Sequence, residues 1–154
     1  MNEHGRLDVE VVKAVRASAT PASIRDVVRR AATLPELKAR LPEGRAVVAY
    51  LLAGDDELRR LNQTFAADDA VTDVLAFAGS GTHLGDVAIS WAAVQRQAVQ
   101  YGHPESVELG LLCVHGLLHL LGWNHESTRG RTEMSRLTAA ALALSGLRLA
   151  SGRL

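Results

Sequence analysis

The chain has 154 residues, of which 47% are hydrophobic and 22% are charged. This length is typical of a single domain, and the apolar content is sufficient for one core, which excludes a largely disordered protein. The 17 basic and 17 acidic residues give a formal net charge of zero, so the overall charge does not attract the protein to nucleic acid or to membranes.

The amino-terminal third predicts a strand, a helix and a second strand. Residues 7–15 are rich in β-branched side chains that partly alternate with charged ones, which indicates a strand. Thr20 is a typical N-cap and Pro21 a typical first helical residue, and apolar residues then recur at helical spacing as far as residues 34–35. Residues 45–53 are almost all apolar, which is typical of a strand buried on both faces.

The middle of the chain predicts a helix and a pair of strands. Asp55 or Asp56 is placed to cap a helix whose apolar residues extend to Phe65. Residues 71–77 and 85–90 are expected to be short strands, and the glycine and serine residues between them are typical of a turn. We therefore expect these two strands to form a hairpin.

The rest of the chain predicts three helices, over residues 91–101, 105–121 and 131–145. We expect the first few residues and the tail over residues 146–154 to fray. This order of elements predicts a single α+β domain over residues 1–154, with a small mixed sheet of about four strands packed with about five helices.

Signals for secretion and for disulfide bonding are absent from the sequence. Cys113 is the only cysteine, so the chain has no internal disulfide and no zinc cage of thiolates. The first 20 residues lack the apolar segment of a secretory signal. The longest apolar stretch is interrupted by His115 and His119 and is too short to cross a bilayer. We expect a cytoplasmic protein that does not contact a membrane.

Three histidines lie within eleven residues, and their spacing is typical of a metal site. His115 and His119 are four residues apart, so on a helix their Cβ atoms lie on one face, about 5 to 6 Å apart. Gly122 is placed to end that helix and to turn the chain so that His125 returns as a third ligand. Three neutral nitrogen ligands leave a fourth position open for water, as in catalytic zinc sites. The sequence therefore predicts one Zn²⁺ per chain at these histidines, and nickel or copper would also accept three imidazoles.

Two other interpretations of the histidines stay open. One is a hydrogen-bonded pair on a helix and a separate surface residue, without a metal. The other is a zinc peptidase, but peptidases place a glutamate directly after the first histidine as the general base. Gly116 occupies that position here, so a peptidase would need another base.

The segment from His115 to His125, with the sequence HGLLHLLGWNH, resembles the H-G-x-L-H-L-x-G-x-D-H signature of the YbeY family. Upstream, Leu61-Asn62, residues 72–77 (TDVLAF) and residues 84–90 (LGDVAIS) are similar to that family's L-N, T-D-V-L-S-F and L-G-D-I-x-I-S motifs, in the same order. The resemblance implies a zinc-dependent endoribonuclease that is specific for single-stranded RNA. It also implies maturation of the 3′ end of 16S ribosomal RNA, ribosome quality control, and association with the ribosomal small subunit in the cytoplasm.

Two positions depart from the family pattern. The family carries an arginine, thought to engage RNA phosphate, in a Y-R-x-K-D stretch after L-N, and Ala66 stands in the corresponding run here. Asn124 replaces the aspartate before the third histidine, and an amide hydrogen-bonds but does not accept a proton as a carboxylate does. Both departures favour an alternative, a ribosome-assembly or binding factor that keeps zinc for stability and has lost most of its nuclease activity. The three intact histidines favour the endoribonuclease.

RNA cleavage needs groups for proton transfer and for phosphate binding beside the metal. The candidates for proton transfer are Glu126 and Asn124 beside the third histidine, and Asp73 or Asp86 if the sheet edge lines the same cleft. The alternative for Glu126, an ordinary solvated loop residue, is the better supported of its two interpretations, and Asp86 is as readily explained as a turn residue.

The candidates for contact with single-stranded RNA are Arg59 and Arg60, the arginines at positions 25, 29 and 30, and Trp123 for stacking on a base. The alternative for the arginines is that they belong to ordinary solvated helix faces. No small-molecule cofactor is expected.

Overall fold

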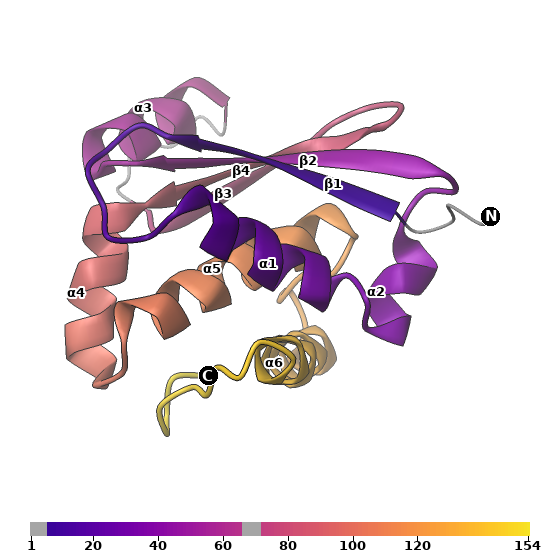
Figure 1. The fold of residues 1–154 in the computed structure, drawn as a ribbon. Helices are drawn as coiled ribbons and strands as arrows, with labels where there is room; N and C mark the ends of the chain where they lie inside the picture. Colours follow the sequence, from indigo (N-terminus) through magenta and orange to yellow (C-terminus); the bar gives the residue numbers. More distant parts are fainter. Residues whose placement is uncertain (1–5, 66–71) are drawn as a thin grey trace.

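A four-stranded mixed sheet lies across a layer of helices in the computed structural model, which describes residues 6–65 and 72–154 (Figure 1). The strands are β1 (Arg6–Lys13), β2 (Arg45–Ala53), β3 (Val74–Ala78) and β4 (His83–Ser90). The helices are α1 (Pro21–Ala31), α2 (Pro35–Arg40), α3 (Asp55–Phe65), α4 (Trp91–Tyr101), α5 (Glu105–Leu120) and α6 (Thr128–Ala143). The predicted class, a single small α+β domain with a mixed sheet of four strands, is confirmed.

The strands follow the order β1-β2-β4-β3 across the sheet. The pairs β1–β2 and β2–β4 are parallel, and each is joined by a connection that contains a helix, as parallel pairs require. The pair β3–β4 is antiparallel, which confirms the predicted hairpin. The apolar strand β2 is central, with neighbours on both edges, which explains why so few of its side chains are polar.

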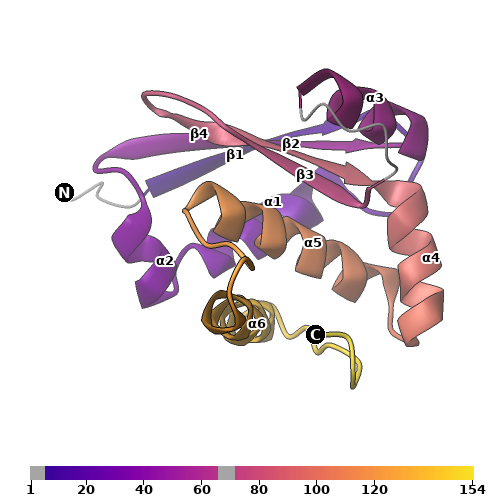
Figure 2. The ribbon, with the colours of Figure 1, turned by 180° about the vertical axis from the view of Figure 1, so that it is seen from behind.

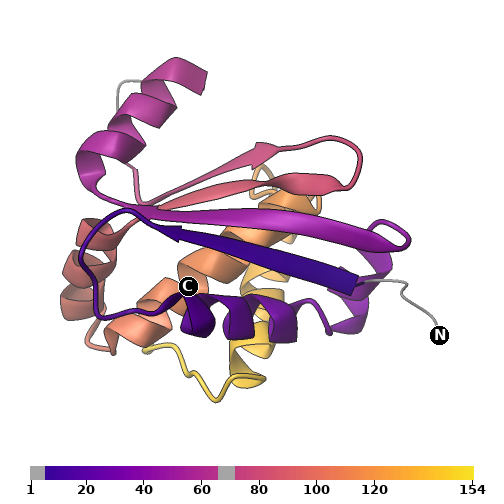
Figure 3. The same ribbon diagram turned by 45° about the horizontal axis from the view of Figure 1, so that its top comes forward.

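The two faces of the sheet are covered differently (Figure 3). Helix α3 lies over one face, where Leu58 packs with Ala53 and Ala88. Helices α1 and α5 lie under the other face, with α6 beneath them (Figure 1). The main core is therefore between the sheet and α1, α5 and α6.

Helix α5 is apolar on nearly all sides because it packs against α1, α4, α6 and the strands β3 and β4. The hydroxyl of Tyr50, on β2, donates a hydrogen bond of 2.8 Å to the carbonyl oxygen of Cys113 in the middle of α5. Burial raises the pKa of Tyr50 far above its usual value, so this phenol stays protonated and keeps its donor. This hydrogen bond fixes the position of α5 relative to β2.

The helix boundaries differ from the predictions at two places. The first helix ends at Ala31, before the break predicted at residues 34–35, and Pro35 starts α2, since proline suits the first helical position. There are thus six helices in the described residues where about five were expected. Helix α6 begins at Thr128, three residues earlier than predicted, because the hydroxyl of Ser127 accepts the Gly130 N–H at 2.9 Å and caps it.

The C-terminal tail, for which fraying was predicted, contacts the body of the protein in this structure. Leu147 and Leu149 pack against the core, and the Ala150 N–H donates to Nδ1 of His103 at 3.1 Å. Arg153 forms an ion pair with the buried Glu108 of α5. Figure 2 shows the tail running from α6 beside α5 toward α4. The amino-terminal residues 1–5, for which fraying was also predicted, lie outside the described residues.

No helix in the described ranges combines the length and the hydropathy that a bilayer crossing requires.

Candidate metal centre

The structure brings His115, His119 and His125 together at the C-terminal end of α5. The Nε2 atoms of His115 and His119 are 3.0 Å apart, and the ring centroids of the three pairs are 4.7, 5.1 and 4.7 Å apart. One ring nitrogen from each residue lies within 4.8 Å of the other two. Two nitrogens bound to one tetrahedral Zn²⁺ are about 3.3 Å apart, given Zn–N distances of about 2.0 to 2.1 Å. This donor set could therefore hold a metal ion.

The turn that returns His125 to the helix is a Schellman motif at the end of α5. Gly122 has a φ of 99°, a left-handed conformation that glycine adopts without strain. The Gly122 N–H donates to the His119 carbonyl and the Trp123 N–H to the Leu118 carbonyl, each at 3.0 Å. The predicted role of Gly122 in ending the helix is confirmed.

Two side chains hold the loop that carries His125. Oδ1 of Asn124 accepts the Glu126 N–H at 3.0 Å, which closes a turn around the histidine. Nη1 of Arg131, on α6, donates to the His125 carbonyl oxygen at 3.1 Å. Asn124 thus shapes the loop with its carbonyl oxygen, an acceptor that aspartate also has.

The histidines lie in the wall of a cavity of about 340 Å³. Burial, with the charges of His119, His125 and Arg153, lowers the pKa of His115 to about 4. Burial, followed by the charge of His125, also lowers the pKa of His119. Both imidazoles are therefore neutral near pH 7, which is the state that binds metals.

Asp73 and Asp86 are on different sides of the molecule. Asp73 lines the cavity, and its Oδ2 accepts a hydrogen bond of 3.3 Å from Nε2 of Gln97, on α4. Asp86 precedes Val87, which contacts α5, so by strand alternation Asp86 is on the opposite face. Its carboxylate is 57% exposed and pairs with His83. Of the two candidates for proton transfer, only Asp73 is at the cavity.

The remaining predicted side chains do not line the cavity. Glu126 is exposed on the loop, and Arg59 and Arg60 are exposed on α3, where Arg60 pairs with Glu57. Ala66, the position of the expected family arginine, lies outside the described residues.

Trp123 is a core residue and does not offer a ring to a nucleotide base. Its side chain is buried, and Cζ of Arg40 lies 3.6 Å from its ring centroid. Its Nε1 donates to Glu133 at 3.3 Å. A base needs a free ring face for stacking, so the prediction that Trp123 binds RNA is not retained.

Sequence reasoning missed a buried polar cluster beside the cavity. Glu108 is fully buried in α5, and its carboxylate accepts hydrogen bonds from Gln97, His103 and Arg153. Burial by itself would raise the pKa of Glu108, but these hydrogen bonds hold it below its usual value. A glutamate inside an apolar helix is a detectable signal, because a buried carboxylate needs a partner. Its partner Arg153 is 45 residues away and carries no such signal.

Comparison with known proteins gives a consistent result. A family model described as "Endoribonuclease YbeY" matches residues 11–146. The protein called Endoribonuclease YbeY in Chloroflexus aurantiacus (strain ATCC 29366 / DSM 635 / J-10-fl) is 43% identical over 124 residues, which cover 73% of this chain and 79% of the relative. The protein of that name in Roseiflexus castenholzii (strain DSM 13941 / HLO8) is 42% identical over 114 residues, which cover 67% of this chain and 70% of the relative.

Among solved structures, the chain is similar to the solution structure of TM1509 from Thermotoga maritima. The TM-score is 0.59 with 22% sequence identity, and the match covers 88% of this chain and 90% of the other. At this identity the likeness supports the fold.

Proposed function

Because this chain belongs to the Endoribonuclease YbeY family, we propose that it is an endoribonuclease that cleaves single-stranded RNA at a zinc site. The proposed ligands are His115, His119 and His125, with one Zn²⁺ per chain. The proposed biological substrate is the 3′ end of 16S ribosomal RNA, and the proposed setting is the ribosomal small subunit in the cytoplasm, with a part in ribosome quality control.

The observation that supports the proposal is the convergence of three imidazoles in one cavity of a protein from this family. Three imidazoles match the nitrogen preference of zinc and leave a fourth coordination position open. A bound Zn²⁺ supplies Lewis-acid stabilisation of a phosphoryl oxygen and lowers the pKa of a water molecule toward about 7.

Asp73 is the proposed proton acceptor. It is the only Asp or Glu among the described residues that line the cavity. Gln97 donates to one of its oxygens, which fixes the orientation of the carboxylate and leaves the other oxygen for a proton. Gln97 is in turn bound to Glu108 at 2.7 Å, so the buried cluster supports the carboxylate.

The peptidase alternative loses support from the packing of α5. A Cβ atom at Gly116 would lie 2.5 Å from Cγ1 of Val87, so the position after the first histidine has no room for a glutamate. The experiment below also tests the assembly-factor alternative, in which zinc is kept for stability.

The test is cleavage of a fluorescent single-stranded RNA by zinc-loaded protein, beside a matched duplex. We expect the single strand to be cut, and an RNA that spans the 3′ end of 16S ribosomal RNA to be cut in preference to an unrelated strand. His119→Ala and a chelator should abolish cleavage, while His83→Ala, on an exposed residue paired with Asp86, should not. Zinc binding without cleavage above the His119→Ala background would refute the nuclease and favour the assembly factor.

A further inference from the structure

The C-terminal tail brings an arginine into the wall of the metal cavity. Arg153 lines this cavity together with His115, His119 and His125. Among the described residues that line it, Arg153 is the only lysine or arginine. The cavity therefore combines the three imidazoles with one fixed positive charge.

Two neighbours fix the orientation of this guanidinium. Its Nε donates to Oε1 of Glu108 at 2.9 Å, and its Nη2 donates to Oε2 at 2.6 Å. Its Cζ lies 4.4 Å from the ring centroid of Tyr101, at the end of α4. The Glu108 carboxylate is itself held by Nε2 of His103 at 2.7 Å. Because Nδ1 of His103 accepts the Ala150 N–H, its Nε2 carries the hydrogen that Glu108 accepts.

One edge of the guanidinium is not used by the ion pair. A guanidinium has five N–H donors, and Glu108 accepts from Nε and from Nη2. Within the part of the chain that the structure describes, Nη1 of Arg153 donates to no group. The edge formed by Nη1 and Nη2 has the fork geometry that matches two oxygens of a phosphate.

We infer that Arg153 binds a phosphate of the RNA strand at the metal cavity, through the Nη1–Nη2 edge, while Glu108 and Tyr101 hold it in position. The inference rests on the proposed function, because it assigns a residue to that same site. A phosphodiester in this cavity meets the histidine cluster and Arg153 at once, since both line it. Arg153 also interacts electrostatically with Asp73, an interaction that raises the pKa of the guanidinium.

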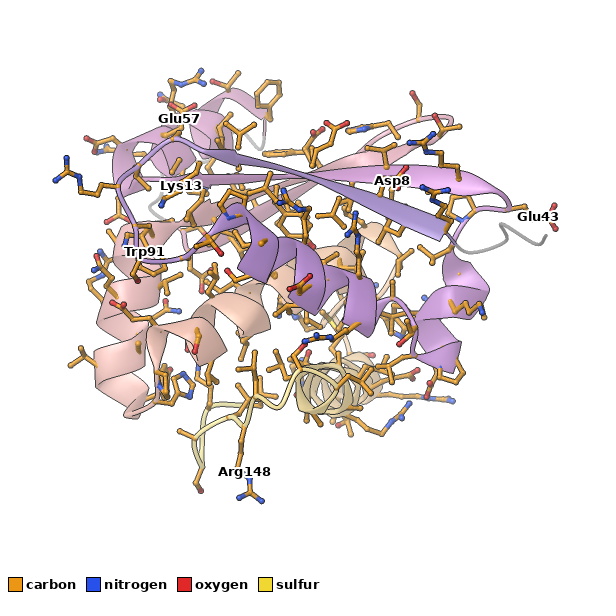
Figure 4. All side chains as sticks on the ribbon, in the orientation of Figure 1. Asp8, Lys13, Glu43, Glu57, Trp91 and Arg148 are labelled. Atoms are coloured by element: carbon orange, nitrogen blue, oxygen red, sulfur yellow. The ribbon has the colours of Figure 1, made fainter. Side chains whose placement is uncertain are left out.

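The test uses Arg153→Lys. Lysine keeps the positive charge and can contact Glu108, but it lacks the second pair of N–H donors with which a guanidinium binds a phosphate. The matched control is Arg148→Ala, which removes a charge from the same tail. Arg148 is exposed, does not line the metal cavity, and points away from the body of the protein (Figure 4). With zinc-loaded protein, we expect Arg153→Lys to raise KM for single-stranded RNA about tenfold, the loss typical of a charge-assisted contact. Arg148→Ala should leave KM within about twofold.

A second readout separates phosphate binding from a merely structural role. Binding of fluorescent single-stranded RNA to chelator-treated protein is measured by anisotropy at several salt concentrations. Each phosphate contact to a single strand contributes about 0.7 to the slope of log K against log salt. Arg153→Gln should lower this slope by about that amount, and Arg148→Ala should not. Thermal unfolding of each variant identifies any that fail to fold. If Arg153→Gln does not fold, the KM of Arg153→Lys is the deciding measurement.

The outcomes distinguish this inference from the proposed function. If the wild type cleaves RNA and folded Arg153 variants match it in KM and salt slope, the inference is overturned and the proposed function stands. The wild type could instead bind RNA without cleaving it, with a salt slope that Arg153→Gln lowers. That result would support phosphate binding by Arg153 and would contradict the proposed nuclease activity.

Discussion

Gly116 lies directly against Val87, so that a Cβ atom on Gly116 would be 2.5 Å from Cγ1 and 3.0 Å from Cγ2 of the valine. This contact joins the C-terminal part of α5 to β4, at the turn of helix that lies between His115 and His119. The missing side chain is therefore what lets the two histidines approach the sheet closely. It also explains why the position after the first histidine is not a catalytic glutamate.

We predict that Gly116→Ala destabilises the protein by about 1 to 2 kcal/mol. Overpacking against Val87 costs about 1 to 3 kcal/mol, and the better helix propensity of alanine offsets at most about 1 kcal/mol of it. Urea unfolding measures the change. Gly54→Ala is the control, because its Cβ would meet only Val15, at an ordinary 3.9 Å. An unchanged free energy of unfolding in Gly116→Ala would show that α5 moves away from β4 without cost.

Purified protein is expected to contain about one zinc ion per chain, and His115→Ala, His119→Ala and His125→Ala should each lose most of it. Removing one of three ligands leaves too few nitrogens for tight binding. A chelator should lower the Tm of the wild type, because zinc binds only the folded site. Elemental analysis gives the metal content, with His83→Ala as the control that keeps it. A zinc content below about a tenth per chain in the wild type would contradict the site.

The ion pair between Glu108 and Arg153 predicts a pH-dependent contribution to stability. The folded-state pKa of Glu108 is lowered from 4.5, so its contribution is present above the unfolded-state value and is lost as the pH falls through the lowered folded-state value. Glu108→Gln, which leaves Arg153 without its counter-charge, should cost about 2 to 3 kcal/mol at pH 7.

Urea unfolding between pH 7 and pH 3 measures this contribution. The difference between wild type and Glu108→Gln should shrink as the pH falls below about 4.5. Glu36→Gln is the control, since Glu36 pairs with Arg136 at the surface, where solvent screens the ion pair. A difference that stays constant over the whole pH range would mean that the Glu108 carboxylate is not ionised in the folded protein.

Asp73→Asn is expected to reduce kcat for RNA cleavage by about 10²-fold or more, because general-base catalysis contributes about 10² to 10⁴. The zinc content should not change, as the amide leaves the three histidines intact. Asp86→Asn removes the same charge from the opposite face of the sheet and should leave kcat unchanged. Equal activity of the two variants would remove Asp73 from the mechanism.

Local patterns in the sequence determined the fold class, most element boundaries and the three candidate metal ligands. The spacing of His115 and His119, the cap at Thr20 and the apolar strand over residues 45–53 each depend on interactions within a few residues. The turn at Gly122 is also local, since its hydrogen bonds join residues that are three and five positions apart. Such features are readable because the chain carries both partners close together.

The tertiary structure decided which other side chains reach the site. Asp73 and Asp86 look alike in the sequence, and only the packing of Val87 against α5 shows that Asp86 points away. Trp123 follows the metal motif, yet Arg40 covers its ring. Arg153 reaches the cavity because Glu108, 45 residues earlier, is buried and requires a cation. These relationships arise from contacts between distant segments, and no local pattern reports which segments meet.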